Sequence, residues 1–127
     1  MEHPPPAELT DPDLIALRDF ALGLPDAVET LPWGERAWGV RKKNFAFFHT
    51  GEHGVSLTCK LPESRYAVEH LPYVKPAGYN LGKSGWMTAT IPPGEKVPVD
   101  ELLDWLDESY RAVAPKTLVK ALDARET

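Results

Sequence analysis

The chain has 127 residues, of which 43% are hydrophobic and 26% are charged, and its formal net charge is −5. This length suits one domain with a modest core and is too short for two. No apolar run approaches the roughly 20 residues of a membrane-spanning helix, and a single cysteine, Cys59, excludes an intramolecular disulfide. We therefore expect a cytoplasmic protein with a flexible, proline-rich tail over residues 1–9 and one domain over residues 10–124.

Charge is distributed unevenly along the chain. Residues 1–35 contain one Lys or Arg against eight Asp or Glu, whereas residues 36–96 contain nine basic residues against four acidic ones. Residues 97–127 are acidic again, with four basic residues against seven. Because the basic middle segment also has the pattern of β-structure, it could form a contact surface.

The first predicted element is a helix over residues 12–22. Thr10 or Asp11 can cap its N-terminus, and leucines recur within it at helical spacing. Residues 26–35 contain proline and glycine, and they are predicted to form an irregular linker.

Three strands are predicted next, over residues 36–42, 44–50 and 55–60. Gly51-Glu52-His53-Gly54 separates the last two and is typical of a hairpin turn. The second strand is apolar on both faces and is expected to be central. In the third strand Leu57 alternates with polar neighbours, which predicts one covered and one open face of the sheet. The open face is expected to carry Ser56, Thr58 and Lys60, with Trp86 and Thr88 beside them.

A short helix, a strand and two further helices complete the prediction. Their expected ranges are residues 62–71, 86–91, 99–114 and 116–124, with a long connection over residues 72–85. The order of elements predicts an α+β fold, in which an antiparallel sheet has helices packed on one face.

No pattern in the sequence indicates catalysis, and we expect a protein that is not an enzyme and has no cofactor. There is no nucleophile elbow or phosphate-binding glycine loop, and Cys59 should face the core. His49 and His53 flank the predicted turn, so they do not form a zinc pair on a helix. The acidic residues of the first helix could bind a hard cation, but solvated carboxylates explain them better.

The basic residues of the middle segment are the candidate binding residues. Lys83 lies in a glycine-rich loop that could approach phosphate, and the 41–43 segment could contact phosphate or simply protect a hairpin edge. Tyr79 and Trp86 could stack on bases or pack as core anchors. The candidate nucleic-acid-binding residues are Arg41, Lys42, Lys43, Lys60, Tyr79, Lys83 and Trp86.

Several short runs, taken in order, resemble the MmcQ/YjbR family across roughly residues 12 to 122. These runs are Lys43-Asn44-Phe45-Ala46, Leu57-Thr58-Cys59-Lys60-Leu61-Pro62-Glu63, Gly78-Tyr79, Gly82-Lys83-Ser84-Gly85-Trp86, Glu101-Leu102 and Ser109-Tyr110-Arg111-Ala112-Val113. Gly82 and Gly85 stand where some members have Asn and His.

The resemblance implies a CyaY-like, frataxin-like fold with a double-wing arrangement, and it implies DNA binding. DNA is therefore the expected partner, with weak, salt-dependent affinity and no membrane association. Two alternatives remain open. The open sheet face could bind a protein or a small ligand, or the acidic first helix could bind metal, as the likeness to frataxin suggests.

Overall fold

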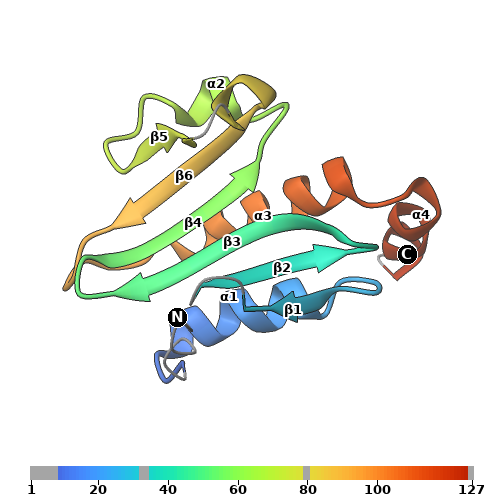
Figure 1. Cartoon of the computed structure of the whole chain (residues 1–127), viewed down its shortest axis with the longest axis horizontal. Coiled ribbons are helices and arrows are strands. Elements are labelled where there is room, and N and C mark those ends of the chain that lie inside the picture. Colours follow the sequence, from blue (N-terminus) through green and yellow to red (C-terminus); the bar gives the residue numbers. More distant parts are fainter. Residues whose placement is uncertain (1–8, 32–34, 79–80, 126–127) are drawn as a thin grey trace, which may run out of the picture.

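The computed structural model describes residues 9–31, 35–78 and 81–125, and it contains one antiparallel sheet and a layer of helices (Figure 1). The strands are β1 Val28–Thr30, β2 Arg36–Val40, β3 Lys43–Gly51, β4 Gly54–Lys60, β5 Val74–Pro76 and β6 Trp86–Ile91. The helices are α1 Pro12–Leu22, α2 Arg65–Val68, the 3₁₀ helix η2 Leu81–Ser84, α3 Val99–Val113 and α4 Lys116–Arg125. None of the helices in these ranges is long and apolar enough to cross a membrane.

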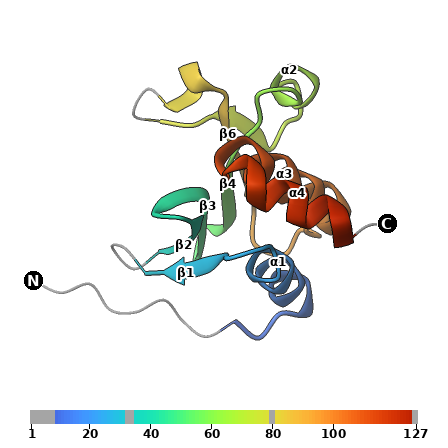
Figure 2. The same cartoon turned by 90° about the vertical axis from the view of Figure 1, so that its right-hand side faces the viewer.

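The six strands lie in the order β1-β2-β3-β4-β6-β5, so β3 is central, as predicted. Figure 2 shows α1, α3 and α4 on one side of the sheet, while the chain around η2 leans to the other side. The predicted α+β class, with helices packed on one sheet face, is confirmed. Residues 1–8 of the predicted tail lie outside the described residues, and Leu9 is already buried in the core.

Two strands were not predicted. β1 lies within the expected linker and β5 within the expected connection, and each has only three residues. Three residues are too few to show an alternating pattern, and the prolines near both strands are typical of loops. The short helix is also smaller than predicted, because Arg65–Val68 replaces the expected range 62–71.

The turn between β2 and β3 corrects the predicted strand over residues 36–42. β2 ends at Val40, which pairs with Lys43, and Arg41 and Lys42 form the two-residue turn between them. Both turn residues have positive φ, at 52° and 69°, which is the pattern of a type I′ hairpin. This turn usually contains Asn-Gly, so the sequence carried no signal for it.

A β-bulge in β3 changes which side chains reach the core. Trp38 pairs with Ala46 and Gly39 with Asn44, so Phe45 is the extra residue. Phe45 is fully buried and meets the ring of Tyr110 on α3 edge-on, with the ring centroids 5.4 Å apart. The bulge therefore adds an aromatic side chain to the helix-facing core that strict alternation would place on the open face.

The hydroxyl of Ser109 on α3 joins β3 to β4 beside this bulge. It donates a hydrogen bond to the carbonyl oxygen of Phe45 at 2.5 Å and accepts one from the amide of Lys60 at 2.8 Å. Ser109 has no exposed surface, so both backbone groups are satisfied without water. A helix side chain thus takes the place of a direct bond between the two strands.

Candidate binding site on the open face of the sheet

The open face carries the polar row predicted for β4. Thr58 pairs with Thr88 on β6, and Lys60 pairs with Trp86, so these four side chains lie together on the side away from the helices. On the other strand that flanks β4, Thr58 pairs with Phe47. This part of the sequence prediction is confirmed by the register of the strands.

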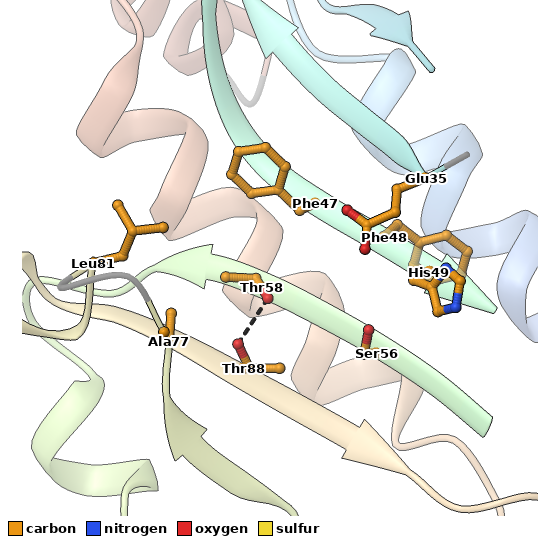
Figure 3. A pocket seen from close by; sticks show the side chains of 10 residues that line it. Glu35, Phe47, Phe48, His49, Ser56, Thr58, Ala77, Leu81 and Thr88 are labelled. Atoms are coloured by element: carbon orange, nitrogen blue, oxygen red, sulfur yellow. Dashed lines mark hydrogen bonds between the residues drawn. The ribbon is translucent and has the colours of Figure 1, made fainter. Parts of the chain in front are cut away.

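The chain near η2 borders this face and leaves a hollow of about 290 Å³ (Figure 3). Its volume is near the lower end of the range for small-molecule sites, which begins at roughly 300 Å³. The residues that line it come from β3, β4, β6, the segment before β2 and the loop after β5. They are Glu35, Phe47, Phe48, His49, Ser56, Thr58, Ala77, Gly78, Leu81 and Thr88.

Hydroxyl groups form the middle of the hollow. The Oγ1 atoms of Thr58 and Thr88 are 2.8 Å apart, and either can be the donor (Figure 3). One hydroxyl hydrogen satisfies this bond, so the other remains able to bind a ligand acceptor. Ser56 contributes a further hydroxyl to the lining. The site therefore offers both donors and acceptors over a small area.

Apolar side chains border the hydroxyl groups on two sides. Figure 3 shows Phe47 on the β3 side and Leu81 on the side of the loop. The Phe47 ring packs against Trp86 with the centroids 5.9 Å apart and the planes tilted by 49°. Phe47 is held in place by this contact, and Leu81 is 37% exposed, so a flat ligand could lie between them.

Opposite charges flank the hollow. Glu35 lines one end of it beside His49. Two lysines lie on the same face outside the lining: Lys75 on β5 pairs with Thr88, and Lys60 lies two residues after Thr58 on β4. The hollow therefore has a carboxylate at the end beside His49, and two lysines lie on the open face away from that end.

The candidate nucleic-acid-binding residues do not lie together. Arg41 forms an ion pair with Asp26, with 2.8 Å between its Nη2 atom and the carboxylate oxygen. Lys42 and Lys43 are exposed near this turn, past the last β3–β4 pair at Ala46 and Cys59. Tyr79 lies outside the described residues.

Lys83 lies in a different place from Lys60. It lines a second, open hollow of about 580 Å³, together with Arg65, Tyr66 and Met87. Met87 pairs with the buried Cys59, so this hollow adjoins the helix-facing side of β6. Of the seven candidates, Lys60 and Trp86 are the two that the strand register makes direct neighbours.

Gly82 and Gly85 have structural reasons to be glycine. A Cβ atom on Gly82 would lie 2.9 Å from the Cβ of Pro76, which is too close without a shift of the backbone. Gly85 has a φ of 89°, a conformation that side chains rarely adopt. The conformation of this loop therefore depends on glycine at both positions.

Other reactive groups are held in structural roles. Burial raises the pKa of the Cys59 thiol, which also lies near the carboxylate of Glu108, so the thiol stays protonated. Glu108 accepts hydrogen bonds from the amides of Glu63 and Ser64 ahead of α2. Over residues 9–31, 35–78 and 81–125, no group of three or more His, Cys, Asp or Glu could hold a metal ion.

Seven of the ten residues that line the hollow were not predicted for the open face, among them Phe47, His49, Glu35 and Leu81. Phe47 and His49 share the open face with Thr58, and the alternation within the predicted second strand could have indicated both. Glu35 and Leu81 could not be found in this way, because both lie in segments predicted as irregular. Glu35 and Leu81 reach the same site through the long-range pairing of the strands next to them, which no local pattern predicts.

The fold and the hollow define a class: small α+β proteins whose six-stranded sheet has one face covered by helices and the other open. Within this class, the family model YjbR matches residues 22–112, and the chain belongs to the YjbR family. The resemblance stated from the sequence is thereby confirmed.

Two solved structures are similar to this chain. Protein DR2400 of Deinococcus radiodurans, with the domain DUF419, has 26% identity and a TM-score of 0.67, and the match covers 87% of each chain. A Pseudomonas syringae protein solved by a structural genomics consortium has 18% identity and a TM-score of 0.59. That match covers 83% of this chain and 100% of the other, and it shows the fold alone. No curated protein matches the chain.

Proposed function

We propose that this YjbR-family protein is a cytoplasmic, non-catalytic binding protein, and that the hollow on the open sheet face holds a small ligand. The observation that supports this most is the convergence of Phe47, Thr58 and Thr88 with Leu81 around one concave site. Small-molecule sites typically have apolar walls and a small number of polar groups that orient the ligand.

The chemistry of the reactive groups supports binding over catalysis. The Cys59 thiol is buried and its pKa is raised, which makes it a poor nucleophile. The threonine hydroxyls of the hollow bond to one another at 2.8 Å, and a neutral hydroxyl is a weak nucleophile unless a base accepts its proton.

A fragment screen by nuclear magnetic resonance tests the proposal. ¹⁵N-labelled protein is titrated with a library of small polar and aromatic compounds, and amide shifts are mapped onto the fold. We expect binders that shift Phe47, Thr58 and Thr88, and these shifts should be lost in Thr58→Val. The proposal fails if every binder shifts amides elsewhere, or if Thr58→Val and wild type respond alike.

DNA binding through the basic residues is a second proposal. It is supported by Lys60 beside Trp86, by Lys75 two strands away on the same face, and by the exposed Lys42 and Lys43. Contacts of this kind would be made to phosphates and would be independent of sequence.

Fluorescence anisotropy with a labelled duplex across a salt series tests the DNA proposal. We expect weak binding that decreases linearly with log salt. The double variant Lys60→Ala/Lys83→Ala should bind less tightly, while Lys96→Ala/Lys116→Ala, which removes the same charge at exposed positions, serves as a charge-matched control. An absence of binding at low salt, or equal binding by the double variant, would contradict the proposal.

A further inference from the structure

We infer that the ligand of the open-face hollow is a guanine mononucleotide, an inference that rests on the proposed function. The base lies against Phe47, its N–H groups face Glu35, and the phosphate is directed toward Lys60 and Lys75. Three properties of the site support this ligand class: its size and aromatic wall, its hydroxyl groups, and the polarity of its charges.

The size and walls of the hollow favour one flat ring system. A volume of about 290 Å³ is small for a ligand site and suits a fused heterocycle, so the ribose and phosphate of the nucleotide would extend out of the hollow along the open face. The Phe47 ring is fixed by its contact with Trp86, so it provides a preformed stacking surface. Leu81 borders the same space from the loop, as a second apolar wall.

The hydroxyl groups favour a ligand with polar edges. The bonded pair of Thr58 and Thr88 keeps one hydroxyl hydrogen available, and its oxygen atoms have further acceptor capacity. A purely apolar ring would leave these groups without ligand partners, whereas ring nitrogens and exocyclic groups of a base can bond to them.

The charges favour a ligand with N–H donors at one end and an anion at the other. A carboxylate has two acceptor oxygens, and the N1–H and N2 amino group of guanine present adjacent donors to such a pair. Glu35 supplies this carboxylate in the lining, at the end marked by His49. Adenine lacks the paired donors on that edge, so the site should prefer guanine.

The two lysines lie where a phosphate attached to the base could be bound. Lys75 on β5 pairs with Thr88. Lys60 lies on the open face of β4, two residues after Thr58. The two lysines lie on strands separated by β6, so only their long side chains could bring both ammonium groups to one anion, and each ammonium group can donate hydrogen bonds to a phosphate. An uncharged guanosine should therefore bind less tightly than the nucleotide.

Calorimetric and NMR titrations with four probes test this inference: guanosine monophosphate, adenosine monophosphate, guanosine and inorganic phosphate. We expect the guanine nucleotide to bind most tightly and to shift the amides of Phe47, Thr58 and Thr88. Glu35→Gln should weaken it about tenfold while leaving adenosine monophosphate unchanged. Lys60→Ala/Lys75→Ala should weaken it about tenfold, to the affinity of guanosine.

Glu52→Gln, at the exposed hairpin turn, and the double variant Lys96→Ala/Lys116→Ala are matched controls and should bind like wild type. The inference is overturned if inorganic phosphate binds as well as the nucleotide, if the shifts lie outside the hollow, or if Glu35→Gln has no effect. If the nucleotide does not bind but fragments do shift the hollow, the inference falls and the proposed small-ligand function stands. If neither binds there, both fall.

Discussion

The helix-facing and open faces of the sheet are built from alternate residues of the same strands, and they use polar groups in different ways. On the helix side of β4, Leu57 and Cys59 are fully buried, and the buried hydroxyl of Ser109 is satisfied by two backbone groups. On the open side, Ser56 and Thr58 keep hydrogen-bonding capacity that the fold does not use. The first face stabilises the protein, and the second is available for a ligand.

The largest expected effect is on the helix-facing side. Leu57→Ala should destabilise the protein by about 3–4 kcal/mol, because it leaves a cavity in a fully buried position. Leu81→Ala is the matched control on the open side and should cost less than about 1 kcal/mol, since this leucine is 37% exposed. Urea unfolding of both variants measures the difference. Equal losses would show that the two faces do not differ as described.

Ser109→Ala is expected to have the next largest effect. It leaves the buried carbonyl of Phe45 and the amide of Lys60 without their shared partner, at a cost of about 2–3 kcal/mol. Ser56→Ala on the open face should change the free energy of unfolding by less than about 0.5 kcal/mol. A cost for Ser109→Ala no greater than that of Ser56→Ala would contradict the bridging role of the Ser109 hydroxyl.

Tyr73→Phe tests a smaller contact between the sheet edge and the helix layer. The Tyr73 hydroxyl donates a hydrogen bond to the carboxylate of Glu101 on α3, and we expect its loss to cost about 1 kcal/mol at neutral pH. Burial and the bond to Glu101 raise the pKa of Tyr73 to about 12.

The raised pKa of Tyr73 predicts how the effect of this variant depends on pH. A folded-state pKa above the unfolded value of 10.0 means that the stabilisation is fully present below pH 10 and is lost as pH rises toward about 12. The stability difference between wild type and Tyr73→Phe should therefore shrink over this interval. Unfolding curves at pH 8 and at pH 11 check this, and a difference that grows with pH would contradict it.

The smallest effect on stability is expected for Thr58→Val, on the open face. The variant removes the hydroxyl bonded to Thr88 at 2.8 Å, but water can replace that partner at a half-exposed site. We expect a change within about 0.5 kcal/mol, together with loss of ligand-induced shifts in the hollow. Thr90→Val, at an exposed position outside the lining, should change neither property.

The sequence allowed the two faces to be predicted, because residues 55–60 alternate strictly and the long helix has a clear apolar stripe. It did not allow the site to be assembled. Glu35 reaches the hollow through pairing of β2 with β3, and Leu81 through the loop after β5, and such long-range register is not encoded in any local pattern. Lys60 and Lys83 belong to the same basic segment, yet they lie in different places for the same reason.

The bulge at Phe45 limited the prediction in another way. A period of two applied to β3 places Phe45 and Phe47 on one face, whereas the extra residue turns Phe45 into the core. Bulges of this kind depend on the partner strand and on the packing of α3, so strand propensity alone does not indicate them.

The bridge formed by Ser109 also links the two faces through one residue, Lys60. The amide of Lys60 donates a hydrogen bond to the fully buried hydroxyl of Ser109 on the helix-facing side, while the Lys60 side chain lies on the open face. Because Ser109 is fully buried, we expect this amide hydrogen to exchange with solvent only when α3 separates locally from β4. The exchange rate of the Lys60 amide should therefore be sensitive to ligand binding on the open face. A ligand that contacts the Lys60 side chain should slow this exchange although it makes no contact with a helix.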